Sequence, residues 1–73
     1  MSQAPNNTEF QAYLNEHHLD PREVAVQSHV RYVTVWSILK NSPITSEHAA
    51  QVRVGLYHMT GIAYWGWIKV LFY

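Results

Sequence analysis

The stretch DPREVAVQSHVRYVTVWSILK, residues 20–40, contains the signals that decide the fold. Its first four residues have the pattern of a helix start. Asp20 can accept a hydrogen bond from the backbone N–H of Glu23, the Glu23 carboxylate can reach back as in a capping box, and Pro21 takes the first helical position. This pattern predicts a helix from Pro21 to Gln27 or Ser28.

A second short helix is predicted directly after the first. Residues 28–31 interrupt the helical pattern, and Val35, Ile38 and Leu39 then restart a 3.6-residue period, which residues 41–43 end. The small residue Ala25 lies where the two helices would cross. Two helices joined by such a short turn form a helix-turn-helix arrangement.

The rest of the chain also reads as helical as far as residue 61. Residues 1–7 are expected to form a disordered leader, after which Asn7 or Thr8 can cap a helix that runs to about His18. Thr45 can cap a last helix over residues 46–59, and Gly61 follows where a left-handed residue is expected. The expected fold class is therefore all-α for residues 8–61.

The segment EVAVQSHVRYVTVWSILK, residues 23–40, resembles the helix-turn-helix of lambda-repressor-like, Cro/CI-type DNA-binding domains. The resemblance extends more loosely over residues 8–61. It implies a small four- to five-helix domain that acts as a transcriptional regulator, with the second helix of the motif in the major groove of duplex DNA. The chain departs from the family at His29, where glycine is preferred, and in its tail, which replaces a fifth helix.

The resemblance also implies which residues contact DNA. Arg31 can bind guanine or phosphate, Val33 can meet a thymine methyl group, and Lys40 can position the helix on phosphate. Thr34 can bind phosphate or cap its own helix. The full set of expected DNA-binding residues is Gln27, Arg31, Tyr32, Val33, Thr34, Trp36, Ser37 and Lys40. For Tyr32 and Trp36, packing within the protein is an open alternative.

Charge is distributed unevenly along a chain of 73 residues with zero formal net charge. The first 23 residues carry four acids and one base, whereas the remainder carries four bases and one acid. No acid lies between Val24 and Ser46, and phosphate contact requires only the docking face to be positive. Because four bases are few, one subunit should bind weakly, and a homodimer is expected.

Other function classes find little support in the sequence. The chain has no cysteine, which excludes disulfides and thiolate sites. His17 and His18 point in different directions on a helix, and His48 and His58 are too far apart to share a metal ion. No catalytic motif is present. We therefore expect no enzyme, no cofactor, no metal and no small-molecule ligand.

The aromatic tail, residues 62–73, has three possible roles. It can fold back over the small core, pair with the tail of a second subunit, or lie on a membrane surface through Trp65 and Trp67. The candidate pairing residues are Tyr64, Trp65, Trp67, Ile68, Leu71 and Phe72. Without a pattern for a secretory signal or a membrane span, a cytoplasmic, nucleoid-associated protein is expected. The alternative function is a protein-interaction module that uses the same fold.

Overall fold

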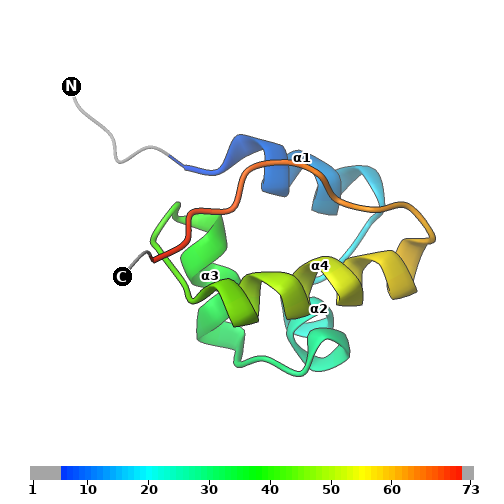
Figure 1. Cartoon of the computed structure of the whole chain (residues 1–73). Helices are drawn as coiled ribbons and strands as arrows, with labels where there is room; N and C mark the ends of the chain where they lie inside the picture. Colours follow the sequence, from blue (N-terminus) through cyan, green and yellow to red (C-terminus); the bar gives the residue numbers. More distant parts are fainter. Residues whose placement is uncertain (1–5, 72–73) are drawn as a thin grey trace.

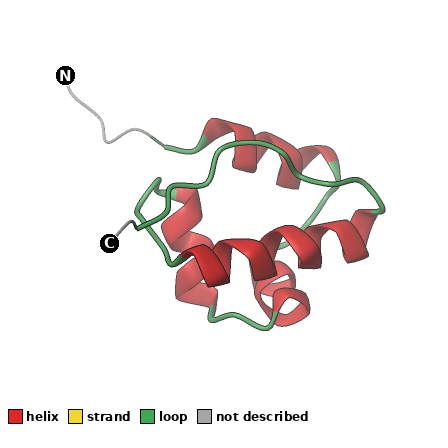
Figure 2. Cartoon of the chain, in the orientation of Figure 1, coloured by secondary structure: helices red, strands yellow, loops and turns green. Residues whose placement is uncertain are grey.

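Helix-start and helix-stop signals in the sequence correspond closely to the helices of the computed structural model, which describes residues 6–71. The helices are α1 (Thr8–Glu16), α2 (Pro21–Ser28), α3 (Tyr32–Leu39) and α4 (Ser46–Thr60) (Figure 1). Within the described range the remaining residues form loops, with one isolated β-bridge between Ile44 and Val70 (Figure 2). The all-α expectation is confirmed.

Polar side chains begin three of the helices. The Asn7 carboxamide oxygen accepts from the backbone N–H of Phe10 at 3.1 Å, and the Thr45 hydroxyl accepts from that of His48 at 3.1 Å. Asp20 differs from expectation, because its carboxylate accepts from the N–H of Arg22 at 2.9 Å rather than from that of Glu23. The expected capping box is thus wrong in its partner, although Asp20 does cap α2.

The turn between α2 and α3 is a Schellman motif. The N–H of His29 donates to the carbonyl of Val26 at 3.2 Å, and the N–H of Val30 donates to the carbonyl of Ala25 at 3.1 Å. His29 itself has φ 58°, in the left-handed region. Since the two bonds satisfy carbonyls at the end of α2, histidine supports the same turn that glycine would form.

Replacing His29 with glycine should therefore stabilise the protein. A left-handed conformation is strained for a residue with a Cβ and unstrained for glycine, so H29G should raise the free energy of unfolding by roughly 0.5–1 kcal/mol. Urea unfolding followed by circular dichroism measures the change. The matched control is G61A at the end of α4, where φ is 76° and the space around a Cβ is open. This variant should lower the free energy of unfolding by about as much as H29G raises it. A destabilised H29G variant would contradict the turn geometry.

The core lies between α1, α2, α3 and α4 and is closed by the tail. Its largest fully buried side chains come from all four helices: Phe10, Val24, Val35, Ile38, Val52 and Leu56. α2 packs closely on α4, where Gly55 faces Ser28. α1 ends at Glu16, two residues before the expected end, because His18 adopts φ 54° and turns the chain toward α2.

The tail runs as an extended strap past α1 and α4 toward the end of α3 (Figure 1). Tyr64 and Ile68 are buried in the core of their own chain. The Arg53 guanidinium donates to the backbone carbonyls of Tyr64 and Gly66 at 2.7 and 3.1 Å, and the Trp67 indole N–H donates to the Asn41 side chain at 2.7 Å. The strap therefore packs on the core of its own chain through Tyr64 and Ile68.

The tail residues expected at a pairing interface divide into two groups. Tyr64 and Ile68 are buried, because a core of four short helices leaves apolar area that the tail covers. Trp65, Trp67 and Leu71 remain exposed, and the Trp65 side chain has 86% of its surface accessible. Phe72 lies outside the described residues. Pairing through this segment can therefore use only residues that the core leaves free.

Stability should fall at high pH because of Tyr64. Burial, together with the negative charge of Glu9, raises the pKa of this phenol to about 12 from an ordinary 10.0, although Arg53 and Asn7 oppose the shift. Between pH 10 and 12 the unfolded chain loses this proton more readily than the folded one, so the free energy of unfolding decreases with pH in that window and not below it.

Urea midpoints measured at pH 7, 9, 10.5 and 11.5 test this pH dependence. In the Y64F variant, the free energy of unfolding should fall less steeply at high pH. In Y57F, on the exposed side of α4, it should fall as steeply as in the unchanged protein. Equal pH profiles for the protein and Y64F would contradict the burial of this hydroxyl.

Candidate nucleic-acid interface

α3 is oriented by the side chains that it buries. Val35 and Ile38 are buried against the core, and α2 packs closely on α3. Because residues three and four apart share a helix face, the opposite face is left to solvent. Arg31, Tyr32, Val33, Trp36 and Lys40 are exposed there, and Ser37 is half-buried.

The structure places Thr34 differently from the other residues expected at this surface. Only 8% of its surface is accessible, and α3 begins without a side-chain cap. It therefore meets neither expected role, phosphate contact or capping. The reason is helical geometry, because Thr34 is four residues before the buried Ile38 and lies on the same inward face.

Two aromatic and two basic side chains form a row along the exposed face. The rings of Tyr32 and Trp36 meet edge to face with centroids 6.0 Å apart. The Arg22 guanidinium lies 5.5 Å from the centroid of Tyr32, and the Lys40 ammonium lies 5.9 Å from that of Trp36. We call Arg22, Tyr32, Trp36 and Lys40 the cation–aromatic row.

Arg22 is the member of this row that sequence reasoning missed. It lies in the first turn of α2, outside the helix that the motif assigns to DNA, and only the packing of α2 on α3 brings it over Tyr32. Favourable contact between a cation and a ring face holds both partners in place. Tyr32 and Trp36 thus pack against neighbouring side chains and also remain exposed. Packing within the protein and contact with DNA are therefore not exclusive roles for these two residues.

Polar side chains lie at the start and in the middle of α3 and near the end of α2. Arg31 precedes the helix in an extended conformation, and no acid lies in the first turn. At the middle, the Ser37 hydroxyl donates to the backbone carbonyl of Val33 at 3.0 Å and is engaged within its own helix. Gln27 is exposed near the end of α2. The N-terminal end of α3 therefore combines an exposed guanidinium with the positive end of a helix dipole.

Metal sites and membrane-spanning helices are absent from the part of the chain that the structure describes. Residues 6–71 contain no group of three or more histidine and acidic side chains that could hold a metal ion. None of the helices in that range has the length and apolar character required to cross a membrane. Comparison with protein-family models, with curated proteins and with solved structures finds no match to the chain.

Proposed function

We propose that the protein binds duplex DNA in a sequence-specific manner as a transcriptional regulator, with α3 in the major groove. The observation that carries this proposal is the exposed face of α3, which combines Arg31, Lys40 and the apolar Val33 without an acidic side chain on the helix. The packing of α2 on α3 and the Schellman turn between them leave this face of α3 directed toward solvent. This arrangement supports a lambda-repressor-like helix-turn-helix.

The cation–aromatic row adds to this proposal. From Tyr32 to Lys40 the helix rises about 12 Å, since each residue adds about 1.5 Å. The major groove of B-DNA is wide enough to admit an α-helix. With α3 in the groove, the cations of the row can approach phosphates, which positions the helix without reading sequence.

Sequence discrimination would come from residues between and beside those cations. Arg31 can form a bidentate contact with guanine, and Val33, with 61% of its surface accessible, can pack against a thymine methyl group. The Tyr32 hydroxyl can form a hydrogen bond with a base or with a phosphate oxygen. Each good bidentate contact contributes roughly 1–3 kcal/mol of discrimination.

A homodimer is part of the proposal. A single subunit offers few phosphate contacts, and specific binders of this class use two half-sites about one helical turn apart. Ile62 and Trp65 form an exposed apolar part of the tail beside the end of α4. Burying such side chains between two subunits would remove them from water, and zero net charge does not oppose association.

The double variant R31A/K40A tests the proposed interface. Loss of two cations should lower affinity for duplex DNA about 10- to 100-fold at low salt and reduce the slope of log affinity against log salt by about 2. Fluorescence anisotropy over a salt series measures both quantities. The matched control, K69A, removes one charge from the tail and should change affinity less than either single variant on α3. Equal losses in K69A and K40A would contradict the assignment.

A protein-interaction module is the second candidate. The apolar side chains exposed on α2 and α3, among them Val26, Val33 and Trp36, favour it because they would suit a protein surface as well as DNA. This candidate predicts no detectable binding to mixed-sequence duplex at low salt with a folded protein. The salt series above therefore separates the two functions.

A further inference from the structure

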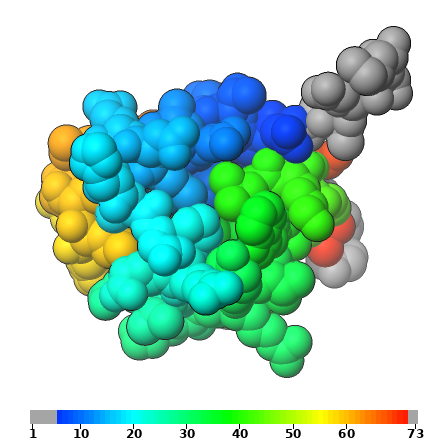
Figure 3. Space-filling view, turned by 180° about the vertical axis from the view of Figure 1, so that it is seen from behind, coloured from blue at the N-terminus to red at the C-terminus, as the bar shows by residue number. Residues whose placement is uncertain are grey.

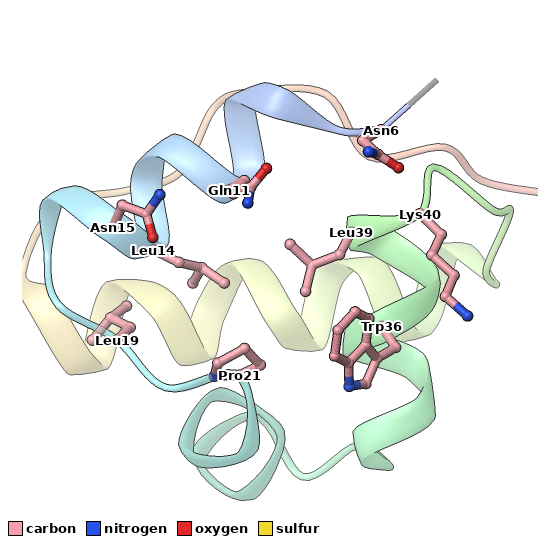
Figure 4. A pocket seen from close by; sticks show the side chains of 9 residues that line it. All are labelled: Asn6, Gln11, Leu14, Asn15, Leu19, Pro21, Trp36, Leu39 and Lys40. Carbon is pink, nitrogen blue, oxygen red and sulfur yellow. The ribbon is translucent and has the colours of Figure 1, made fainter. Parts of the chain in front are cut away.

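A pocket of about 280 Å³ lies between α1, the start of α2 and α3, at one edge of the exposed face of α3. Figure 3 shows these three helices meeting on one side of the molecule. The apolar walls of the pocket include Leu14, Pro21, Trp36 and Leu39. The amides of Gln11 and Asn15 line the pocket from α1 (Figure 4). The pocket is slightly smaller than the roughly 300–1,000 Å³ usual for small-molecule sites.

The amide groups of this pocket favour a ligand that can both donate and accept hydrogen bonds. Each amide side chain offers an NH₂ donor and a carbonyl acceptor. None of the described residues that line the pocket is acidic, and Lys40 is the one base among them. Gln11 and Asn15 are one helical turn apart on α1, so their amides lie on one face of that helix. Amides of this kind bind the edge of adenine through its amino group and ring nitrogen.

The apolar groups favour a flat ring system. In Figure 4 the Trp36 indole has Lys40 to one side and Pro21 and Leu14 to the other, and the Gln11 amide extends from α1 toward the space between them. Lys40 lies 5.9 Å from the centroid of the indole. Trp36 is 41% exposed, and an exposed indole can stack on any base with an aromatic face.

We propose that this pocket binds a purine nucleoside, with the base against Trp36 and its edge on the amides of Gln11 and Asn15. This site lies at the edge of the expected reading surface and shares Trp36 and Lys40 with it. It contradicts the expectation of no small-molecule ligand, and it does not depend on DNA binding. A ligand of this size in a small open pocket should bind with a dissociation constant of about 0.1–1 mM.

Nuclear magnetic resonance of the folded protein without DNA tests this proposal, with adenosine as the probe. Adenosine should shift the indole N–H resonance of Trp36, assigned with W36F, and the side-chain NH₂ resonances of Gln11 and Asn15. Trp65, which is almost fully exposed and outside the pocket, is the internal control and should not shift. Purine riboside, which lacks the amino group, should bind about fivefold more weakly.

Variants separate a built site from non-specific stacking. Q11M keeps the volume of the side chain and removes its amide, so adenosine binding should weaken about five- to tenfold. Q51M makes the same change on α4, outside this pocket, and should bind as the unchanged protein does. The proposal is overturned if Trp36 does not shift at 10-fold above the expected range (~10 mM), if Trp65 shifts as much as Trp36, or if Q11M binds adenosine undiminished.

Discussion

Replacing Phe10 with alanine should remove a large part of the stability of the protein. Phe10 is fully buried, and its ring meets that of Tyr64 edge to face at 5.5 Å, so it joins α1 to the tail across the core. Truncation of a buried phenylalanine costs about 3–5 kcal/mol. A domain of this length has a total stability of roughly 4–11 kcal/mol, so the loss is a large part of it.

Circular dichroism and urea unfolding measure the effect of F10A. Y57A is the matched control, because Tyr57 is an aromatic residue on the exposed side of α4 and its truncation should change stability by no more than about 0.5 kcal/mol. If F10A costs less than about 1 kcal/mol, the tail does not close the core over α1.

Replacing Gly55 with alanine should separate α2 from α4. A Cβ at Gly55 would lie 2.1 Å from the Ser28 hydroxyl oxygen and 2.9 Å from the Ser28 Cα. The second distance involves backbone, so a change of rotamer does not relieve it. We expect G55A to cost about 3 kcal/mol, despite the higher helix propensity of alanine.

A double-mutant cycle with Ser28 identifies the cause. The Ser28 hydroxyl is buried and has no hydrogen-bond partner within the described residues, so S28A alone should be neutral or slightly stabilising. S28G removes both side-chain atoms that approach Gly55 and should recover about half of the G55A loss when the two changes are combined. Strictly additive effects would show that the two helices do not meet at this pair.

Local signals in the sequence are sufficient to predict where the helices begin and end. Asp20, Thr45 and Gly61 mark helix ends that the structure places within two residues of expectation, because caps and left-handed residues act through their neighbours in sequence. Thr34 was misplaced although the same kind of signal was available. Its four-residue spacing from Ile38 predicts the buried face, whereas the resemblance to the DNA-binding motif places it among the contact residues.

The remaining features depend on how distant segments pack. Arg22 reaches Tyr32, and Gln11 and Trp36 line one pocket, only after α1, α2 and α3 have packed. The tail has neither a helical nor a strand period, and its path is fixed by partners far away in the sequence, such as Arg53 and Asn41. No local pattern at residues 62–71 specifies those partners.

Selection of bound sequences from a random duplex pool tests DNA binding by α3 most directly. The protein should enrich a palindromic site whose half-sites are about 10–10.5 base pairs apart, and the folded R31A/K40A variant should enrich none. Palindromic symmetry would also support the homodimer. A folded protein that enriches no sequence and shows no duplex binding at low salt would contradict the proposed function.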